Sequence, residues 1–402
     1  MEKFRLSNGI TVLFKKVPSK SVAVEVMVRT GSNYESSDIA GISHFIEHML
    51  FEGTEKRPTS LHITNEIESL GGEFNAYTTG DRTAYYVKVL AKNFDKALDV
   101  LSDIISNPLF SEKTIEKEKK VVIKEIHMVM DDPRFYQWVF FEKSILKKHP
   151  AKNPTYGNVS SVKGLTRKKI MDYYKKYYIP SKIILSIAGN VESVKDKCEK
   201  YFSKMRKAKI TALPKFSEPP NEKQETFREK RKTMSAYMIL GYKVPPRMHK
   251  DTYVLDVIAS VLGRGQSGKI FDEVRSKRGL AYEVSVKSET NLDYGLFAVQ
   301  CSINKEKIET AKNIILGEFR KLKNLKESEL EEAKGYIEGS YALHTEDTFK
   351  MADEFSFWEL IQDANLEERY IEKIKKVSRE DVARISEKYL NDKFTMAVIE
   401  PR

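Results

Sequence analysis

One short stretch of the chain combines the residue types that a hydrolytic metal site requires. His44, Glu47 and His48 lie within Gly41–Phe51 in the pattern His-x-x-Glu-His. Apolar neighbours and bracketing glycines predict a short helix here, and residues three and four apart on a helix share a face. Two histidines at this spacing offer two nitrogens to zinc, and Glu47 could take a proton from a metal-activated water. The alternative interpretation is two core histidines beside a surface glutamate.

The spacing of residues in the sequence does not identify the third metal ligand. Zinc in a hydrolytic site takes three protein ligands and keeps one open position. Residues 112–130 have helical spacing, and Glu118 and Glu125 are seven apart, so they lie on one partly apolar face. A carboxylate there needs a partner, and a cation would serve; the alternative is that both pair with neighbouring lysines. Spacing alone does not choose among Glu73, Asp81, Glu118 and Glu125.

Composition predicts a globular chain of two or three domains. The chain has 402 residues, 41% of them hydrophobic and 10% aromatic. No run reaches the length of a membrane span, and the N-terminus has no signal or transit character. We therefore expect a cytoplasmic protein without a membrane partner. Cys198 and Cys301 lie far apart and suggest a reducing compartment.

The formal net charge of +11 does not predict a nucleic-acid partner. Lysines alternate with glutamates in 116–120 and 326–334, which is typical of solvated, ion-paired helix faces, and no nucleic-acid module is recognisable. Residues 263–270 nearly match a phosphate-binding loop. However, Ile270 cannot coordinate magnesium, and a helix rather than a strand is predicted before the segment. We expect no nucleotide site there.

Hydrophobic periodicity predicts alternating strands and helices along the chain. The predicted strands are 4–17 (a hairpin), 22–28, 74–79, 83–90, 182–188, 235–242, 282–287 and 295–303. The predicted helices, besides the two above, are 61–70, 93–105, 135–146, 166–178, one ending at 202, 253–262, 306–322, 328–344 and 353–362.

The second half of the chain repeats the first. Residues 165–185 match residues 377–396: each has a Ser or Thr helix cap, a helix, a Lys-Tyr pair and a closing strand. The proline-containing segment 210–222 is the predicted linker. We therefore predict an α+β fold of two tandem homologous domains, 1–209 and 223–402, each a mostly antiparallel sheet packed with helices. Residues 252–262 contain no His or Glu, so only the first domain can bind the metal.

These motifs together resemble the insulinase/pitrilysin family of inverse-zincin metallopeptidases, whose motif is His-x-x-Glu-His. The resemblance spans nearly the whole chain, in the two-domain bacterial form also seen in processing-peptidase subunits. It implies Zn²⁺ on His44, His48 and Glu125, the second glutamate of a Glu-x6-Glu pair. It also implies that Glu47 is the general base and that Glu118 is an outer carboxylate that orients a ligand or assists proton transfer.

The same resemblance implies an Arg and a Tyr seven residues apart in the non-metal domain. Arg275 and Tyr282 match, with Arg278 as a competitor for the arginine. Tyr282 would donate a hydrogen bond to the oxyanion, and Arg275 would hold the substrate backbone. The alternative for Tyr282 is an ordinary strand tyrosine.

Residues 72–78 resemble the family's edge strand, to which substrate adds as an extra β-strand. Asn75, Ala76 and Tyr77 are then substrate-binding residues; the alternative is a plain edge strand.

The expected function is zinc-dependent hydrolysis of short or unfolded peptides inside a closed chamber. One chain of this form would supply half of the chamber, so a homodimer is expected, and a heterodimer with a related chain also fits. The alternative is a non-catalytic scaffold or assembly subunit of the same fold, which would contain no zinc.

Overall fold

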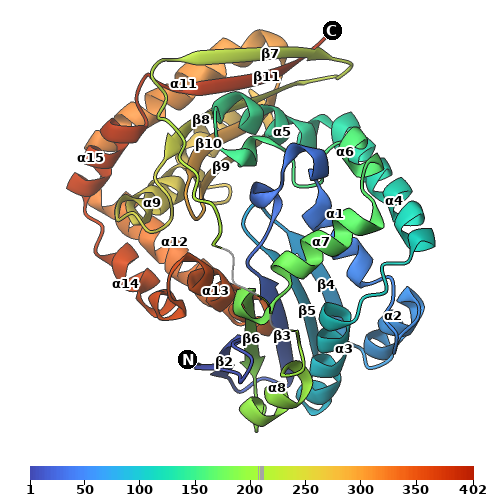
Figure 1. The fold of residues 1–402 in the computed structure, drawn as a ribbon. Coiled ribbons are helices and arrows are strands. Elements are labelled where there is room, and N and C mark those ends of the chain that lie inside the picture. The colour runs from blue at the N-terminus through green and yellow to red at the C-terminus, as the bar shows by residue number, and fades with distance from the viewer. Residues whose placement is uncertain (207, 209–211) are drawn as a thin grey trace. The chain divides into compact units, whose positions relative to one another are not determined.

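The computed structural model describes residues 1–206, 208 and 212–402. Residues 210 and 211 of the predicted linker lie outside the described part of the chain. The chain divides into two compact units, each assembled from separated segments. Unit 1 comprises Met1–His127, Asn153–Pro214 and Leu343–Glu367, and unit 2 comprises Met128–Lys152, Lys215–Ala342 and Glu368–Arg402. Figure 1 shows their helices and strands.

Unit 1 is built on a six-stranded sheet in the order β1-β2-β6-β3-β5-β4. All neighbouring pairs are antiparallel except β2 and β6. The central strand β3 is buried along nearly its whole length, as its run of valines predicts. Its strands are β1 (Glu2–Arg5), β2 (Thr11–Lys16), β3 (Ser21–Val28), β4 (Glu73–Thr78), β5 (Thr83–Leu90) and β6 (Ile183–Gly189).

Unit 2 is built on a five-stranded sheet in the order β7-β11-β8-β10-β9. Here β7 and β11 are parallel and the other pairs are antiparallel. Its strands are β7 (Glu225–Arg231), β8 (Ala236–Val244), β9 (Ala281–Thr290), β10 (Gly295–Ile303) and β11 (Thr395–Pro401).

The two sheets confirm the predicted repeat. In unit 1 the last strand, β6, pairs parallel with β2 and antiparallel with β3. In unit 2 the last strand, β11, likewise pairs parallel with β7 and antiparallel with β8. Helices α7 (Arg167–Tyr177) and α15 (Arg379–Tyr389), capped by Thr166 and Ser378, precede β6 and β11. The prediction of an α+β fold with two tandem, mostly antiparallel domains is therefore confirmed.

Each unit takes one helix from the other half of the chain. Helix α13 (Thr348–Ile361) packs on β3 and β6 of unit 1, and α5 (Pro133–Ile145) packs on β8 and β11 of unit 2. Phe141 of α5 lies so close to Gly241 that a Cβ at that position would come within 2.5 Å of the ring. The units therefore differ from the linear division 1–209 and 223–402, although the boundary after Pro214 falls inside the predicted linker.

Most of the remaining long helices match predicted helices, whereas the shorter ones were not predicted. Longer ones include α1 (Ile42–Leu50), α2 (Ser60–Glu68), α3 (Phe94–Ser106), α4 (Glu112–Asp131), α7 (Arg167–Tyr177), α8 (Val194–Phe202), α9 (Asp251–Gly263), α11 (Ile308–Lys321), α12 (Glu327–Thr345) and α15 (Arg379–Tyr389). Shorter ones are α6 (Val159–Lys163), α10 (Lys269–Phe271) and α14 (Tyr370–Lys375). Among the described residues, no helix is both long enough and apolar enough to cross a bilayer.

Candidate metal centre

Helix α1 presents both histidines of the motif from one face. The apolar residues Phe45, Ile46 and Met49 are buried in unit 1, which leaves His44 and His48 together on the opposite, partly exposed side. Their ring centroids are 4.7 Å apart. The periodicity of the helix and the burial of its apolar stripe thus fix the two imidazoles side by side.

The start of α1 is held by a carboxylate that the sequence analysis did not single out. Glu35 accepts hydrogen bonds from the backbone N–H groups of Gly41 (2.6 Å) and Ser43 (2.8 Å). Gly41 has φ +91°, and a Cβ there would lie 2.4 Å from the Tyr156 carbonyl oxygen, so a glycine is required. Burial raises the pKa of Glu35 to about 7, against the opposing effect of these hydrogen bonds.

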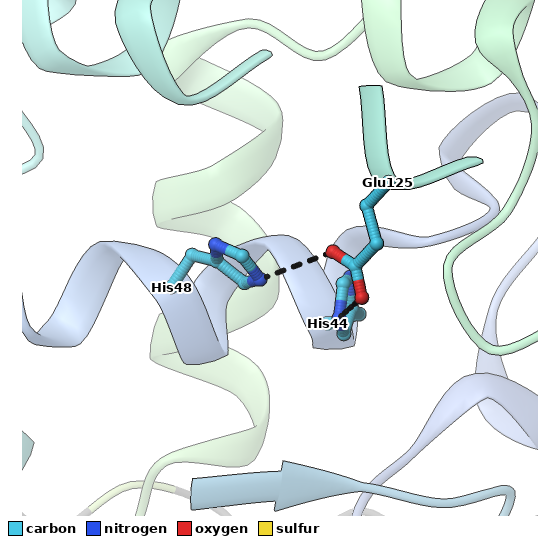
Figure 2. Close-up of side chains that lie close together, drawn as sticks. All are labelled: His44, His48 and Glu125. Atoms are coloured by element: carbon cyan, nitrogen blue, oxygen red, sulfur yellow. Dashed lines mark ion pairs between the residues drawn. The ribbon is translucent and has the colours of Figure 1, made fainter. Parts of the chain in front are cut away.

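Helix α4 brings Glu125 to the histidine pair, as Figure 2 shows. Glu125 Oε1 lies 3.6 Å from His44 Nε2, and its Oε2 lies 3.6 Å from His48 Nε2. One donor atom from each of the three residues falls within 4.8 Å of the others. Helices from segments about 80 residues apart in sequence thus converge on one point.

The three side chains fit a zinc ion. Two ligands about 2.0–2.1 Å from a tetrahedral zinc lie about 3.4 Å from each other, close to the observed nitrogen–oxygen separations of 3.6 Å. Two imidazole nitrogens and one carboxylate are also a donor set of hydrolytic zinc sites. Burial, and then the nearby His48, lowers the pKa of His44 to about 3, which keeps that imidazole in the neutral form a metal needs.

Glu118 lies beside the second histidine, on the side away from Glu125. Its Oε2 lies 3.4 Å from Nδ1 of His48, the nitrogen that does not face Glu125. Burial opposes ionisation of Glu118, but interactions with His48 and Lys117 lower its pKa below the usual value. Burial likewise opposes charge on His48, yet Glu118 and Glu125 raise its pKa. A carboxylate on the outer nitrogen of a ligand histidine fixes its ring and increases its basicity.

Glu47 stays outside the donor set and is held by the sheet. Its carboxylate accepts a hydrogen bond from the hydroxyl of Thr78, on the adjacent strand β4. Burial raises the pKa of Glu47, partly offset by this bond. A carboxylate of raised pKa beside a metal site is suited to accept a proton and return it. The sequence analysis missed Thr78, although strand alternation places it on the same face as Phe74 and Ala76.

The other glutamate and aspartate candidates lie elsewhere. Asp81 accepts a hydrogen bond of 2.8 Å from the side chain of Asn33. Glu73 is an exposed residue at the start of β4. Of the four carboxylates that spacing left open, Glu125 is the one whose oxygens face both histidines.

The residues predicted to bind substrate lie on an edge strand but face different ways. Strand β4 is at the end of its sheet and, among the described residues, pairs only with β5. Because side chains alternate, Ala76 shares the face of α1, whereas Asn75 and Tyr77 face the opposite side, where Tyr77 donates to Asp353 of α13. The tyrosine hydroxyl therefore has a structural partner.

Arg275 and Tyr282 lie close together in unit 2. Arg275 belongs to the π-helical turn Asp272–Ser276, and Tyr282 to β9. The guanidinium lies 5.6 Å from the centre of the Tyr282 ring, while Arg278 donates to Glu273. Tyr282 is 78% exposed, unlike a core strand tyrosine. Of the two candidate arginines, Arg275 is the one beside the tyrosine.

Together, the fold and the donor set define a class: two-domain α+β proteins with a helix-borne His-x-x-Glu-His motif and a distant glutamate ligand. The model of the insulinase peptidase family M16 matches residues 11–158. The model of the M16 inactive domain matches residues 164–336.

Individual relatives match over the whole length. The chain is 32% identical to an uncharacterized zinc protease of Rickettsia felis, over 99% of this chain and 97% of that one. It is 30% identical to the uncharacterized zinc protease YmxG of Bacillus subtilis, over 100% and 98%. The chain belongs to peptidase family M16.

Solved structures share the fold. The crystal structure of a protease from Helicobacter pylori has a TM-score of 0.95 at 24% identity, covering 100% of this chain and 99% of that one. A putative M16-like peptidase from Alicyclobacillus acidocaldarius has a TM-score of 0.86 at 19% identity, covering 100% and 98%.

Proposed function

We propose that this protein is a zinc-dependent endopeptidase that hydrolyses short or unfolded peptides. One observation carries the proposal: the donor atoms of His44, His48 and Glu125 lie within 4.8 Å of one another, with Glu47 left outside the set. The names of the curated relatives, which are zinc proteases, support it.

In this proposal, different residues of the chain have different roles in peptide hydrolysis. A zinc ion on the triad would supply Lewis-acid activation of a water molecule and of the scissile carbonyl. Glu47 accepts the proton of the attacking water as the carbon–oxygen bond forms. It returns that proton to the amine nitrogen as the carbon–nitrogen bond breaks. Thr78 holds the Glu47 carboxylate, and Glu118 fixes the ring of His48.

The proposal includes a substrate-binding strand and a chamber formed by two chains. Main-chain pairing along the free edge of β4 would tolerate many sequences, and Ala76 lies on the same sheet face as α1. Arg275 and Tyr282 of one copy would complete the metal site of the second copy in a homodimer. Tyr282 would donate to the developing oxyanion.

A complementation assay tests the shared site. Glu47→Gln and Tyr282→Phe chains, each weakly active alone, are unfolded together and refolded as a mixture. If sites are shared, mixed dimers contain one intact site, and random mixing restores about a quarter of wild-type activity. If each site lies within one chain, or the protein is a monomer by measured mass, mixing restores nothing and the chamber proposal fails.

The second candidate is a non-catalytic subunit of the same fold. Residues 164–336 match a domain described as inactive, and complex III2 of Candida albicans contains a chain that shares the fold (TM-score 0.85, 18% identity). The presence of His44, His48, Glu125 and Glu47 favours the enzyme. Metal analysis separates the two: about one zinc per chain and chelator-sensitive digestion of a peptide library support the peptidase.

A further inference from the structure

The C-terminal end of β4 is attached to helices on both faces of its sheet. Tyr77 and Thr78 are neighbours, so their side chains point to opposite faces. Thr78 donates a hydrogen bond to Glu47 of α1. Tyr77 donates a hydrogen bond to Asp353 of α13. Two adjacent residues of β4 thus connect Glu47, the proposed general base, on one face of the sheet with helix α13 on the other face.

The attachment to α13 is a network and not a single bond. Arg82, which follows β4 in the turn to β5, donates from Nε to the Tyr77 hydroxyl at 3.0 Å. Its Nη2 lies 3.8 Å from Asp353 Oδ1, and its guanidinium lies 4.9 Å from the centre of the Phe357 ring on α13. The arginine therefore packs against α13 and contacts both partners of the Tyr77–Asp353 bond.

A further carboxyl group, that of Glu25, adjoins the cluster and interacts with Asp353 and Arg82. It projects from β3, is fully buried, and neither carboxylate oxygen has a hydrogen-bond partner. Burial, and then the charge of Asp353, raises its pKa well above the usual value, whereas Arg82 acts in the opposite direction.

An edge strand needs such an attachment more than a central one does. Strand β4 has a neighbour on one side only, so half of its backbone groups do not restrain its position. A shift at its end would move the Thr78 hydroxyl, and with it the carboxylate of Glu47. Displacements of about 1 Å at a catalytic group have large kinetic costs.

We propose that Tyr77, Arg82 and Asp353 are positioning residues for the general base. They fix the end of β4 from the side of α13, so that Thr78 holds Glu47 in place. Tyr77 then acts through Thr78 and not through contact with substrate. The inference rests on the proposed peptidase function, because it assigns Glu47 its catalytic role.

The experiment combines steady-state kinetics with amide hydrogen exchange on the full-length zinc-loaded protein. Tyr77→Phe removes one oxygen, Asp353→Asn removes the charge of its acceptor, and Thr78→Val removes the link to Glu47. We expect kcat to fall roughly 3- to 10-fold in each variant, with a smaller change in KM. Thr78→Ser, which keeps the hydroxyl, restores kcat.

Amide hydrogen exchange distinguishes the Tyr77–Asp353 hydrogen bond, which is proposed to hold the strand, from the Thr78–Glu47 hydrogen bond. Amides of residues 73–78 exchange faster in Tyr77→Phe and Asp353→Asn, and at the wild-type rate in Thr78→Val. We expect two matched control variants to have the wild-type kcat and the wild-type exchange rates for the amides of β4. Tyr86 lies on the same sheet face as Tyr77, and its ring stacks on Phe349 of α13. Tyr86→Phe removes its hydroxyl but keeps the ring. Asp347→Asn weakens the ion pair between Lys88 and Asp347, the residue that caps the N-terminus of α13.

The outcomes separate this inference from the proposed function. Unchanged kcat and unchanged β4 exchange in Tyr77→Phe and Asp353→Asn overturn the inference, as does an equal effect in the two controls. If the wild-type protein has no chelator-sensitive activity, the proposed function fails. Exchange of residues 73–78 then still decides whether Tyr77 and Asp353 hold the strand. Should Asp353→Asn not fold, Arg82→Lys replaces it.

Discussion

At the scale of single residues, Glu47 and Glu125 have the same charge on neighbouring helices but different tasks. Glu125 faces both Nε2 atoms, whereas Glu47 accepts a hydrogen bond from Thr78 and is not one of the three residues of the donor set. We expect Glu47→Gln to lower kcat by at least about 10²-fold, because general-base catalysis contributes that much. Bound zinc, measured by metal analysis, should stay at the wild-type level.

An exposed glutamate provides the control for this substitution. Glu68→Gln, at the end of α2, should leave both activity and zinc unchanged. A Glu47→Gln variant with full activity and full zinc content would contradict the assignment of the base.

The carboxylate behind His48 should affect metal affinity more than stability. Glu118→Gln removes the charge 3.4 Å from His48 Nδ1, and loss of such a partner typically weakens metal binding about 10- to 100-fold. Competition with a chromogenic chelator measures the change. Glu116→Gln, on the same helix and paired with Lys119, should bind zinc as the wild type does. Equal affinities in the two variants would rule out the orienting role.

At the scale of elements, the helix that carries the motif depends on its N-terminal carboxylate. The pKa of Glu35 is about 7 in the fold and near its ordinary value in the unfolded chain. The folded state therefore binds more protons between about pH 4.5 and 7. Over this window the contribution of Glu35 to the free energy of unfolding falls as pH rises.

The prediction compares Glu35→Gln with the wild type. Gln is uncharged at every pH, so it carries a constant penalty for the lost acceptor but no titration. The wild type should lose roughly 2 kcal/mol more stability than Glu35→Gln between pH 5 and 8. Denaturant unfolding at several pH values measures the difference. Parallel pH profiles for the two proteins would show that burial does not raise this pKa.

At the scale of the whole molecule, the exchanged helices make the two halves of the chain interdependent. Helix α13 buries Phe355 and Trp358 in unit 1, and α5 buries Phe141 and Ile145 in the core of unit 2. Removing α13 exposes a large apolar sheet face. We expect residues 1–209 alone, the domain drawn from the linear sequence, to show no cooperative thermal unfolding.

A fusion provides the matched control for that truncation. Residues 1–214 joined to 343–367 by a flexible linker restore all segments of unit 1. This fusion should unfold cooperatively and bind zinc, as followed by circular dichroism and metal analysis. A fragment 1–209 that melts as sharply as the fusion would show that α13 is dispensable.

Local signals in the sequence predicted most of the strands and long helices, the internal repeat and the helix that carries both histidines. Apolar periodicity, caps and turn residues are local signals, so α1, α4 and β3–β5 lie within a few residues of their predicted bounds. The charged strand β7, Glu225–Arg231, was missed because alternating charges on a sheet edge look like a loop. The helix predicted over 328–344 is α12, Glu327–Thr345.

Spacing and periodicity did not show which distant residues lie together, although the family resemblance implied Glu125 as the third ligand. Spacing left four carboxylates open. In the structure Glu125 of α4 lies beside the two histidines of α1, and Glu118 lies near Nδ1 of His48. The exchange of α5 and α13, and the pairs that Glu35 and Tyr77 make, were not predicted. Long-range packing depends on the combined burial of many side chains. A local sequence pattern therefore does not show which strand a helix will pack against.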